Sequence, residues 1–314
     1  MVGSAANSRP RIGGVTGGTT ITAAAVSLSD ADFGNITAAG AATPWAGTRL
    51  GNLGGNTNIT FATPKTVYWN QPAGGNWSDV AWATSSGGSA GANNFPLPQD
   101  TAILDDTGVG ASSTIVMDYG WAFQLNASSL TNALTINWNC FGNLSASSMG
   151  DFTLSSAVTI TYTSGALGFN SLASLSIITT AGVSIPIATV NFSATSDTLR
   201  LADNFTSTGN VVGLVAGTLD LNGKTLSCVT FDSTFTGLEV RSIAFNSGQI
   251  NVTGNNATVW ACEDLTNFSY TGTPTVNFTY SGSTGTRNIV HGNIGGTETN
   301  AVDFNIEIGR ASCR

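Results

Sequence analysis

Charged residues are scarce in this chain of 314 residues, of which they make up only 9%. Soluble globular domains typically carry about a quarter. Because a long amphipathic helix needs a charged face, this scarcity excludes a fold built on long helices. The polar surface must come from Ser, Thr, Asn and Gly, which alternate with apolar residues in patterns typical of short strands joined by tight turns. We therefore predict an all-β fold.

Basic residues are the scarcer of the two signs: the sequence has 10 Lys and Arg against 18 Asp and Glu, and a formal net charge of −8. No cluster of Lys and Arg occurs, which excludes nucleic acid as a partner. No apolar run approaches the roughly eighteen residues of a membrane span. Residues 1–18 contain two arginines but no apolar segment behind them, so we expect no secretory signal peptide.

Histidine and cysteine are also rare. The single histidine, His291, is not accompanied by a G-x-S-x-G motif, which argues against a Ser–His–Asp hydrolase. One histidine is also too few for a metal site rich in histidine. Cys140, Cys228 and Cys262 lie far apart in the sequence, and their spacing fits no zinc-binding pattern. We interpret these cysteines as free thiols buried in the core.

The last residues, 307–314, differ from the rest of the chain. Residues 308–314 (IGRASCR) match the translation of a common short-read sequencing adaptor, and they hold two of the 10 basic residues. We interpret 307–314 as a non-native tail, so that Cys313 and both terminal arginines carry no function. On this interpretation the natural chain continues beyond about Asn305.

Composition divides the remaining chain into three segments. Residues 1–66 are rich in Gly, Ala and Thr, and we predict irregular β-structure there. Residues 67–113 carry clustered tryptophans, which predict a compact cap or insertion, because large aromatic side chains let a loop-rich segment bury its own small core. Residues 114–306 contain repeated short strands of period two, separated by Gly, Asn and Ser turns.

The repeats within residues 114–306 indicate a stack of turns. Residues 217–223 (GTLDLNG) and 248–254 (GQINVTG) share terminal glycines and alternating apolar residues. Alternation sends one row of side chains inward, and single turns cannot bury that row alone. We predict an irregular β-solenoid, similar to a parallel β-helix, with an aromatic-rich head segment. A β-sandwich array is the alternative, although the lack of edge-protecting charges favours the solenoid.

Aromatic side chains are the best candidates for a binding site. Tyr68, Trp69, Trp77 and Trp82 would form a platform for glycans if their ring faces were open to stacking sugars. Core packing of the same cluster is the alternative, because Trp is highly buried on average.

Aspartates are the candidates for metal binding. Asp105 and Asp106, together with backbone carbonyls, would suit a Ca²⁺ site, although the spacing of an EF-hand is absent. The alternative is that they form turns and cap strand ends, which is a common use of Asp. We assign no catalytic residue and no required cofactor. An acidic pair that cleaves polysaccharide would have to come from these two residues or from Asp100, Asp118, Glu263 and Asp264.

Four pieces of the sequence are similar to a family of phage virion and tail-associated β-repeat proteins found in environmental viral sequences. They are residues 67–69 (VYW) with 75–77 (GNW), residues 95–100 (FPLPQD), residues 217–226 (GTLDLNGKTL) and residues 271–305.

This resemblance implies a non-enzymatic structural component of a phage tail, fibre or particle surface. Such a protein would be made in the host cytoplasm without a signal peptide and would reside in the virion. Its partners would be other virion proteins and host-surface polysaccharide, and a homotrimer is common among β-helical fibres. Two alternatives stay open: a tailspike-like polysaccharide depolymerase, and a fragment of a bacterial surface adhesin.

Overall fold

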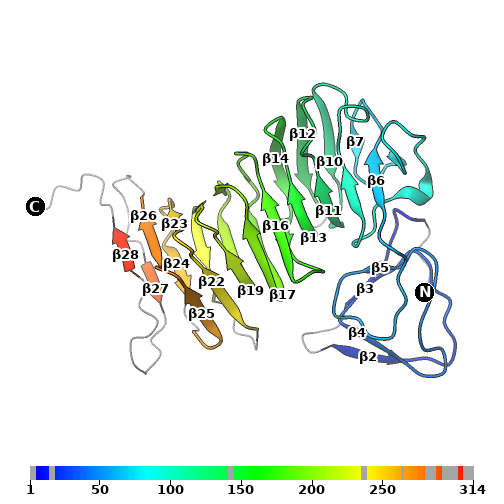
Figure 1. Ribbon diagram of the computed structural model, residues 1–314, viewed down its shortest axis with the longest axis horizontal. Helices are drawn as coiled ribbons and strands as arrows, with labels where there is room; N and C mark the ends of the chain where they lie inside the picture. The colour runs from blue at the N-terminus through cyan, green and yellow to red at the C-terminus, as the bar shows by residue number, and fades with distance from the viewer. Residues whose placement is uncertain are drawn as a thin grey trace, which may run out of the picture.

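The computed structural model describes residues 5–13, 18–140, 144–234, 239–262, 265–279, 288–291 and 303–306. These residues form 28 β-strands, one short 3-10 helix (η1, Ala92–Asn94) and no α-helix. All described strand pairings but one are parallel, and most strands pair with a strand one turn later in the chain. The described chain is therefore a β-solenoid and not a β-sandwich, as the repeats predict (Figure 1).

One long sheet runs the length of the larger coil, which we call the main coil. Ten of its strands stack in parallel along one path, and the same sheet also takes in β16 (Leu175–Thr179), β22 (Arg241–Ala244), β25 (Phe268–Thr271) and the antiparallel β8 (Trp82–Ala83). The ten are β6 (Thr66–Trp69), β9 (Thr101–Ile103), β11 (Ala122–Asn126), β13 (Ser145–Thr153), β15 (Ala166–Phe169), β17 (Thr189–Leu201), β19 (Val211–Asp220), β21 (Thr230–Asp232), β24 (Thr258–Cys262) and β27 (Asn288–His291).

The opposite side of this main coil is made of two shorter sheets, with an isolated bridge between Ile185 and Ser207 in the region between them. The first contains β7 (Gly75–Asn76), β10 (Ser113–Met117), β12 (Leu134–Asn139) and β14 (Val158–Ser164). The second contains β18 (Phe205–Thr206), β20 (Thr225–Cys228), β23 (Gln249–Val252), β26 (Thr275–Phe278) and β28 (Asp303–Ile306).

The length of a turn varies along the main coil. Val211 pairs with Thr230, whereas Trp260 pairs with Ile289 after a clearly longer stretch of chain. Residues 217–223 end β19 and residues 248–254 contain β23, and these two strands belong to different sheets. The two similar heptapeptides therefore do not occupy equivalent positions in the coil. Their likeness reflects the shared needs of any strand that is followed by a corner.

The core follows from the alternation along each strand. In β12, Leu134, Ile136 and Trp138 are buried, while Thr135 and Asn137 are partly exposed. Inward residues on successive turns lie above one another, so like residues stack. The ring centroids of Phe169 and Phe192 are 5.3 Å apart with nearly parallel planes. Aromatic pairs of this kind add about 0.5–1.5 kcal/mol beyond their burial.

Polar side chains hold the corners between strands. Asp220 Oδ1 accepts hydrogen bonds from the backbone N–H of Asn222 (2.8 Å) and from Asn246 Nδ2 on the next turn (2.9 Å). Asn222 and Asn246 both have positive φ, at 50° and 45°, a conformation that Asn tolerates better than most residues. This explains why Asn and Asp are so frequent at the turns.

Residues 5–13 and 18–65 form a second, smaller coil, which we call the N-terminal coil. Its strands are β1 (Arg11–Gly13), β2 (Thr19–Thr22), β3 (Asp32–Gly34), β4 (Ile36–Ala39) and β5 (Gly51–Asn52). Arg11 pairs with Asp32 and Asp32 pairs with Gly51, both in parallel, so two turns of similar length follow one another. Its core is separate from that of the main coil and is built around Phe33, Trp45 and Leu50. The Gly/Ala/Thr-rich segment is thus more regular than its composition predicts.

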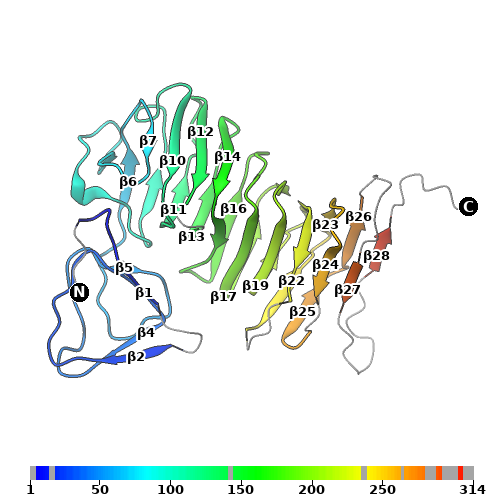
Figure 2. The ribbon, with the colours of Figure 1, turned by 180° about the vertical axis from the view of Figure 1, so that it is seen from behind.

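The N-terminal coil lies beside the first turns of the main coil (Figures 1 and 2). The side chain of Gln99 joins them: its Nε2 donates to Leu50 O, and its Oε1 accepts from the backbone N–H of Asn52, both at 3.0 Å. The tryptophan-rich segment lies at the head of the main coil and shares its core. It forms the first turn of the main coil, in which β6 pairs in parallel with β9 and the hairpin to β8 extends the turn.

Oppositely charged side chains stack on successive turns of the N-terminal coil. Arg9 Nε donates to Asp32 Oδ1 (2.7 Å). On the next turn Arg49 Nη2 donates to Asp30 Oδ2 (2.7 Å), and Arg9 Nη1 lies 3.6 Å from Asp30 Oδ1. Arg9, Asp30 and Asp32 are almost fully buried. An uncompensated buried charge is costly, so these ion pairs disfavour any other stacking order of the turns.

No helix among the described residues is both long and apolar enough to cross a membrane.

We predict that Asp32→Ala destabilises the N-terminal coil by about 3–5 kcal/mol, because it leaves the buried Arg9 guanidinium without its closest carboxylate. Arg11→Ala is the matched control, since Arg11 lies 3.9 Å from Asp32 and its side chain is 31% exposed; it should cost about 1 kcal/mol or less. Hydrogen exchange of β3 and β4 during urea titration reports on this coil alone. Equal losses in the two variants would contradict the prediction.

Candidate functional site

The tryptophan cluster at the head of the main coil is packed inside the core. The relative exposures of Trp69, Trp77 and Trp82 are 0%, 0% and 1%. The rings of Trp69 and Trp77 both contact Trp82 edge to face, with centroids 5.3 and 4.7 Å away. Of the four residues predicted to form a glycan platform, only Tyr68 is partly exposed. The predicted platform is therefore wrong, because sugars cannot stack on rings that have no open face.

The local sequence explains this burial. In β6, Val67 and Trp69 point inward and Tyr68 points outward, as alternation along a strand requires. The indole N–H of Trp69 donates to Gln71 O (3.0 Å), and that of Trp82 donates to Trp77 O (3.1 Å). The cluster thus fills the first turn of the coil, where a long loop would otherwise leave a void.

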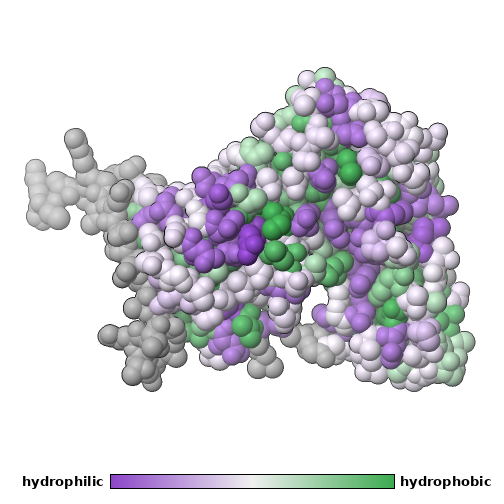
Figure 3. All heavy atoms as spheres, viewed as in Figure 1, coloured by the Kyte–Doolittle hydropathy of each residue, from purple (hydrophilic) through white to green (hydrophobic). Residues whose placement is uncertain are grey.

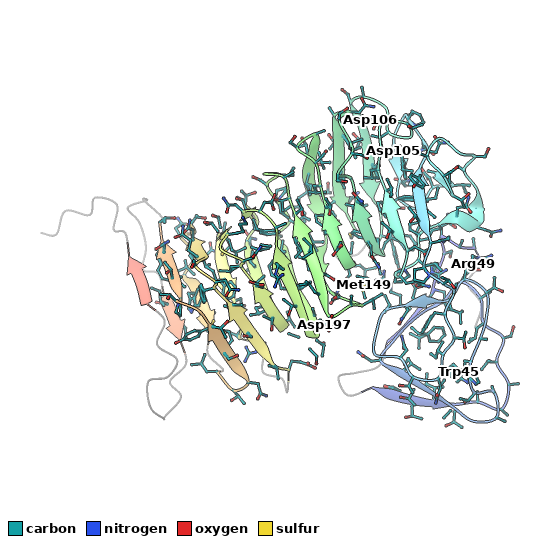
Figure 4. The ribbon with its side chains drawn as sticks, in the orientation of Figure 1. Trp45, Arg49, Asp105, Asp106, Met149 and Asp197 are labelled. Atoms are coloured by element: carbon teal, nitrogen blue, oxygen red, sulfur yellow. The ribbon has the colours of Figure 1, made fainter. Side chains whose placement is uncertain are left out.

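Asp105 and Asp106 form and join turns. Asp105 Oδ1 accepts from the backbone N–H groups of Thr107 and Gly108, which closes its own turn. Asp106 reaches the next turn of the coil, where it accepts from the backbone N–H of Thr131 (2.8 Å) and of Asn132 (2.7 Å) and from Thr131 Oγ1 (2.6 Å). Figure 4 shows both carboxylates at the outer edge of the coil.

These contacts do not support the predicted Ca²⁺ site, because both carboxylates bond to N–H groups of the chain. Among the residues that the structure describes, no three His, Cys, Asp or Glu side chains gather as a metal site needs. The two carboxylates serve separate turns and do not converge on one point. The alternative interpretation, in which they form turns, accounts for their contacts.

The other candidate acids have structural partners where they are described. Asp100 accepts from Lys65 Nζ (2.5 Å) and from the backbone N–H of Leu97 (3.0 Å). Asp118 accepts from Ser78 Oγ (2.5 Å) and from Trp121 Nε1 (3.2 Å). Glu263, Asp264, the side chain of His291 and the tail 307–314 lie outside the described residues.

The three cysteines Cys140, Cys228 and Cys262 are buried and free, as the sequence predicts. Burial raises the pKa of the Cys140 thiol to about 11 and that of the Cys228 and Cys262 thiols to about 12. Because the thiolate is the nucleophile, these side chains are unreactive at neutral pH.

The structure contains a groove of about 460 Å³ where the two coils meet, which we call the junction groove. Asn52 and Pro64 line it from the N-terminal coil, and residues of four successive turns line it from the main coil. Figure 4 places Met149 on the side of the main coil that faces the N-terminal coil, and Figure 3 shows the hollow between the two coils. The residues from the main coil include Gln99, Gln124, Met149, Asp151, Leu172 and Leu175.

A β-bulge shapes the groove. Phe123 pairs with Ser148 and Leu125 pairs with Phe152, so the single residue Gln124 lies opposite three residues of β13. Gly150 is the middle one, and a Cβ there would come within 2.7 Å of the Gln124 side chain. The glycine therefore makes room for the amide. Bulges often re-aim side chains next to functional sites.

Sequence reasoning missed this groove for a physical reason. Its lining residues are far apart in the chain, and turns of unequal length hide which of them share one side of the coil. In the sequence, Gln124 and Asp151 look like ordinary outward-facing residues of two separate strands. Only the register of those strands brings them together.

Comparison of the chain with protein-family models, with curated proteins and with solved structures gives no match. The geometry alone therefore defines the class of the protein, which is a parallel β-solenoid with a second, smaller coil at its head.

Trp77→Ala should destabilise the main coil by about 3–5 kcal/mol, the usual cost of deleting a large buried aromatic side chain. Tyr68→Ala, on the neighbouring strand of the same turn, should cost less than about 1 kcal/mol because Tyr68 points outward. Urea unfolding followed by tryptophan fluorescence measures both. A loss for Tyr68→Ala as large as that for Trp77→Ala would contradict the described orientation of β6.

Asp106 makes the stability of the coil depend on pH. The hydrogen bonds from Thr131 and Asn132 lower the pKa of the Asp106 carboxyl below its usual 3.8. A carboxyl with a lowered pKa stabilises the fold above its unfolded pKa and loses this effect as the pH falls through its folded pKa.

The wild-type protein should therefore be more stable than Asp106→Asn at pH 7, and the difference should shrink below about pH 4. Urea unfolding of both proteins between about pH 7 and about pH 3 measures this. A difference that is constant over this range would show that the hydrogen bonds do not favour the ionised carboxyl.

Proposed function

We propose that the chain is a non-enzymatic structural module of a phage particle, which acts as a rigid spacer and presents its outer surface to the host. The observation that carries this proposal is the unbroken path of ten parallel strands from β6 to β27, with one continuous core beneath it. Each turn is hydrogen-bonded to the turns on both sides. Such a stack resists bending and stretching, as a spacer in a tail or fibre must.

The outer surface supports the same role. Outward positions carry mostly Ser, Thr and Asn, and neighbouring turns are joined by amides: Asn277 Nδ2 donates to Asn251 Oδ1 (2.9 Å) and to Gln249 Oε1 (3.2 Å). Figure 3 shows a face that is mostly pale or purple, with small green patches. An uncharged polar surface of this kind suits contact with polysaccharide and needs no ionic partner. The similarity to phage virion and tail-associated proteins favours a particle as its place.

The depolymerase alternative needs two carboxyl groups, either about 5 Å apart or about 6.5–9.5 Å apart across the scissile bond. The junction groove is larger than a second hollow of about 380 Å³ that Val158 and Pro186 help to line. Asp151 is the one carboxylate among the residues that line the junction groove. This favours a binding surface over a catalytic one.

Location tests the proposal. Antibodies raised against the chain should label intact phage particles purified from the viral community that carries the gene, and the neighbouring genes should encode tail or capsid components. Label confined to bacterial envelopes, with secretion genes next to the reading frame, would overturn the proposal in favour of a bacterial adhesin.

Incubation with capsular polysaccharide or lipopolysaccharide tests the absence of catalysis. The expected result is no release of reducing ends above that of a heat-unfolded control. Release that is lost in Asp151→Asn would show a depolymerase and overturn the non-enzymatic assignment.

A further inference from the structure

The junction groove has the chemistry of a site for uncharged polar ligands. Asp151 Oδ1 accepts from the backbone N–H of Ile177 (2.7 Å), and no hydrogen bond in the described part of the chain uses its Oδ2. Gln124 Nε2 donates to Gln99 O (3.3 Å), and its Oε1 likewise has no partner among the described residues. Each side chain is thus held in place by one atom and offers the other to a ligand.

Aliphatic side chains complete the lining. Leu172 and Leu175 border the polar groups, and Leu175 is 39% exposed, which is high for a leucine. A pyranose ring presents hydroxyl groups around its edge and C–H groups on its faces. It can therefore bond to amide and carboxylate oxygens while it covers leucine carbons. Ligand sites typically combine apolar walls with a few placed polar groups in this way.

The charge of the groove argues against anionic ligands and against tightly bound divalent cations. No Lys, Arg or His is among its lining residues, and its one ionisable side chain is an acid. Phosphate, sulfate and nucleic acid would meet no cation there. A single carboxylate is also too few for a tightly bound divalent ion.

The length of the groove indicates a chain of sugars. Thr101, Gln124, Asp151 and Ser176 lie on four successive turns. Strands in a sheet are about 4.8 Å apart, so three steps span roughly 14 Å, which is longer than one pyranose ring.

We propose that the junction groove binds a neutral oligosaccharide of two or more units. Asp151 Oδ2 and Gln124 Oε1 accept hydrogen bonds from sugar hydroxyls, and Leu172 and Leu175 contact the ring faces. The bulge at Gly150 holds the Gln124 amide in position. The inference rests on the proposed surface-presenting role and names the site by which that surface contacts glycans.

The test uses the full chain on an array of immobilised oligosaccharides of glucose, mannose, galactose and N-acetylglucosamine, with heparin fragments as the anionic counterpart. The wild-type protein should bind at least one neutral series and bind heparin less well. Asp151→Asn and Gln124→Ala should each weaken that binding about tenfold, the effect of losing one strong hydrogen bond. Gly150→Ala should weaken it too, because the new methyl group displaces the amide that Gln124 still carries.

Asp197→Asn is the matched control. Asp197 lies one turn beyond the last turn that lines the groove, next to Thr198, which pairs with Leu175, and it does not line the groove itself (Figure 4). The substitution removes the same charge, and burial already raises the pKa of Asp197, so its neutral form is tolerated. Binding should be unchanged, and melting temperatures should confirm that all variants fold.

Three results would overturn the site: no binding to any neutral series, stronger binding to heparin, or equal binding by the wild-type protein, Asp151→Asn and Gln124→Ala. These results leave the particle assignment intact, since antibody labelling tests that separately. Conversely, a chain that is absent from particles but binds glycans through the groove would overturn only the proposed location.

Discussion

Hydrogen bonding between successive turns is the constraint on which the whole structure depends. Because almost all strands pair in parallel, and in register except at a few bulges, most inward side chains pack against one on the neighbouring turn, and corners recur along the coil. Phe169 above Phe192, and Asn246 above Asp220, are two results of this one requirement. The fold is repetitive in its backbone without being repetitive in its sequence, since many side chains satisfy the same stacking condition.

The sequence predicts the class of fold because strand alternation and turn residues are local signals. The scarcity of charge and the period-two segments in residues 114–306 predict an all-β fold and favour a solenoid over a β-sandwich array. Boundaries are not predictable in the same way. Clustered tryptophans predict a cap or insertion over residues 67–113, but they do not indicate that β6 pairs with β9 and so gives the coil its first turn. The N-terminal coil is not predicted because its short, low-complexity strands resemble irregular chain.

The candidate site depends even more than the fold on contacts between residues far apart in the sequence. Residue type alone leaves Asp105 and Asp106 open between a Ca²⁺ site and turn formation, and their hydrogen bonds to backbone N–H groups identify the second role. Whether Trp77 faces solvent or core depends on which side of the strand the coil closes. The groove depends on a further step, since Gln124 meets Asp151 only through a bulge that shifts the register of β13 against β11. No spacing rule in the sequence encodes that shift.

Turn length nearly doubles between the shortest and longest examples described above: Val211 meets Thr230, whereas Thr66 meets its partner only at Thr101, yet the paired strands remain parallel and in contact. Part of the extra length is itself strand, since β8 lies between β6 and β9 in the chain and pairs with β6, and the rest lies in the loops between strands. Longer loops between strands cost little in loop-closure entropy when they spare corner hydrogen bonds such as those of Asp220, whereas a shift of one residue within a strand would turn its whole inward row to solvent. The stacked strands can thus stay the same while the loops between them change at little cost in stability.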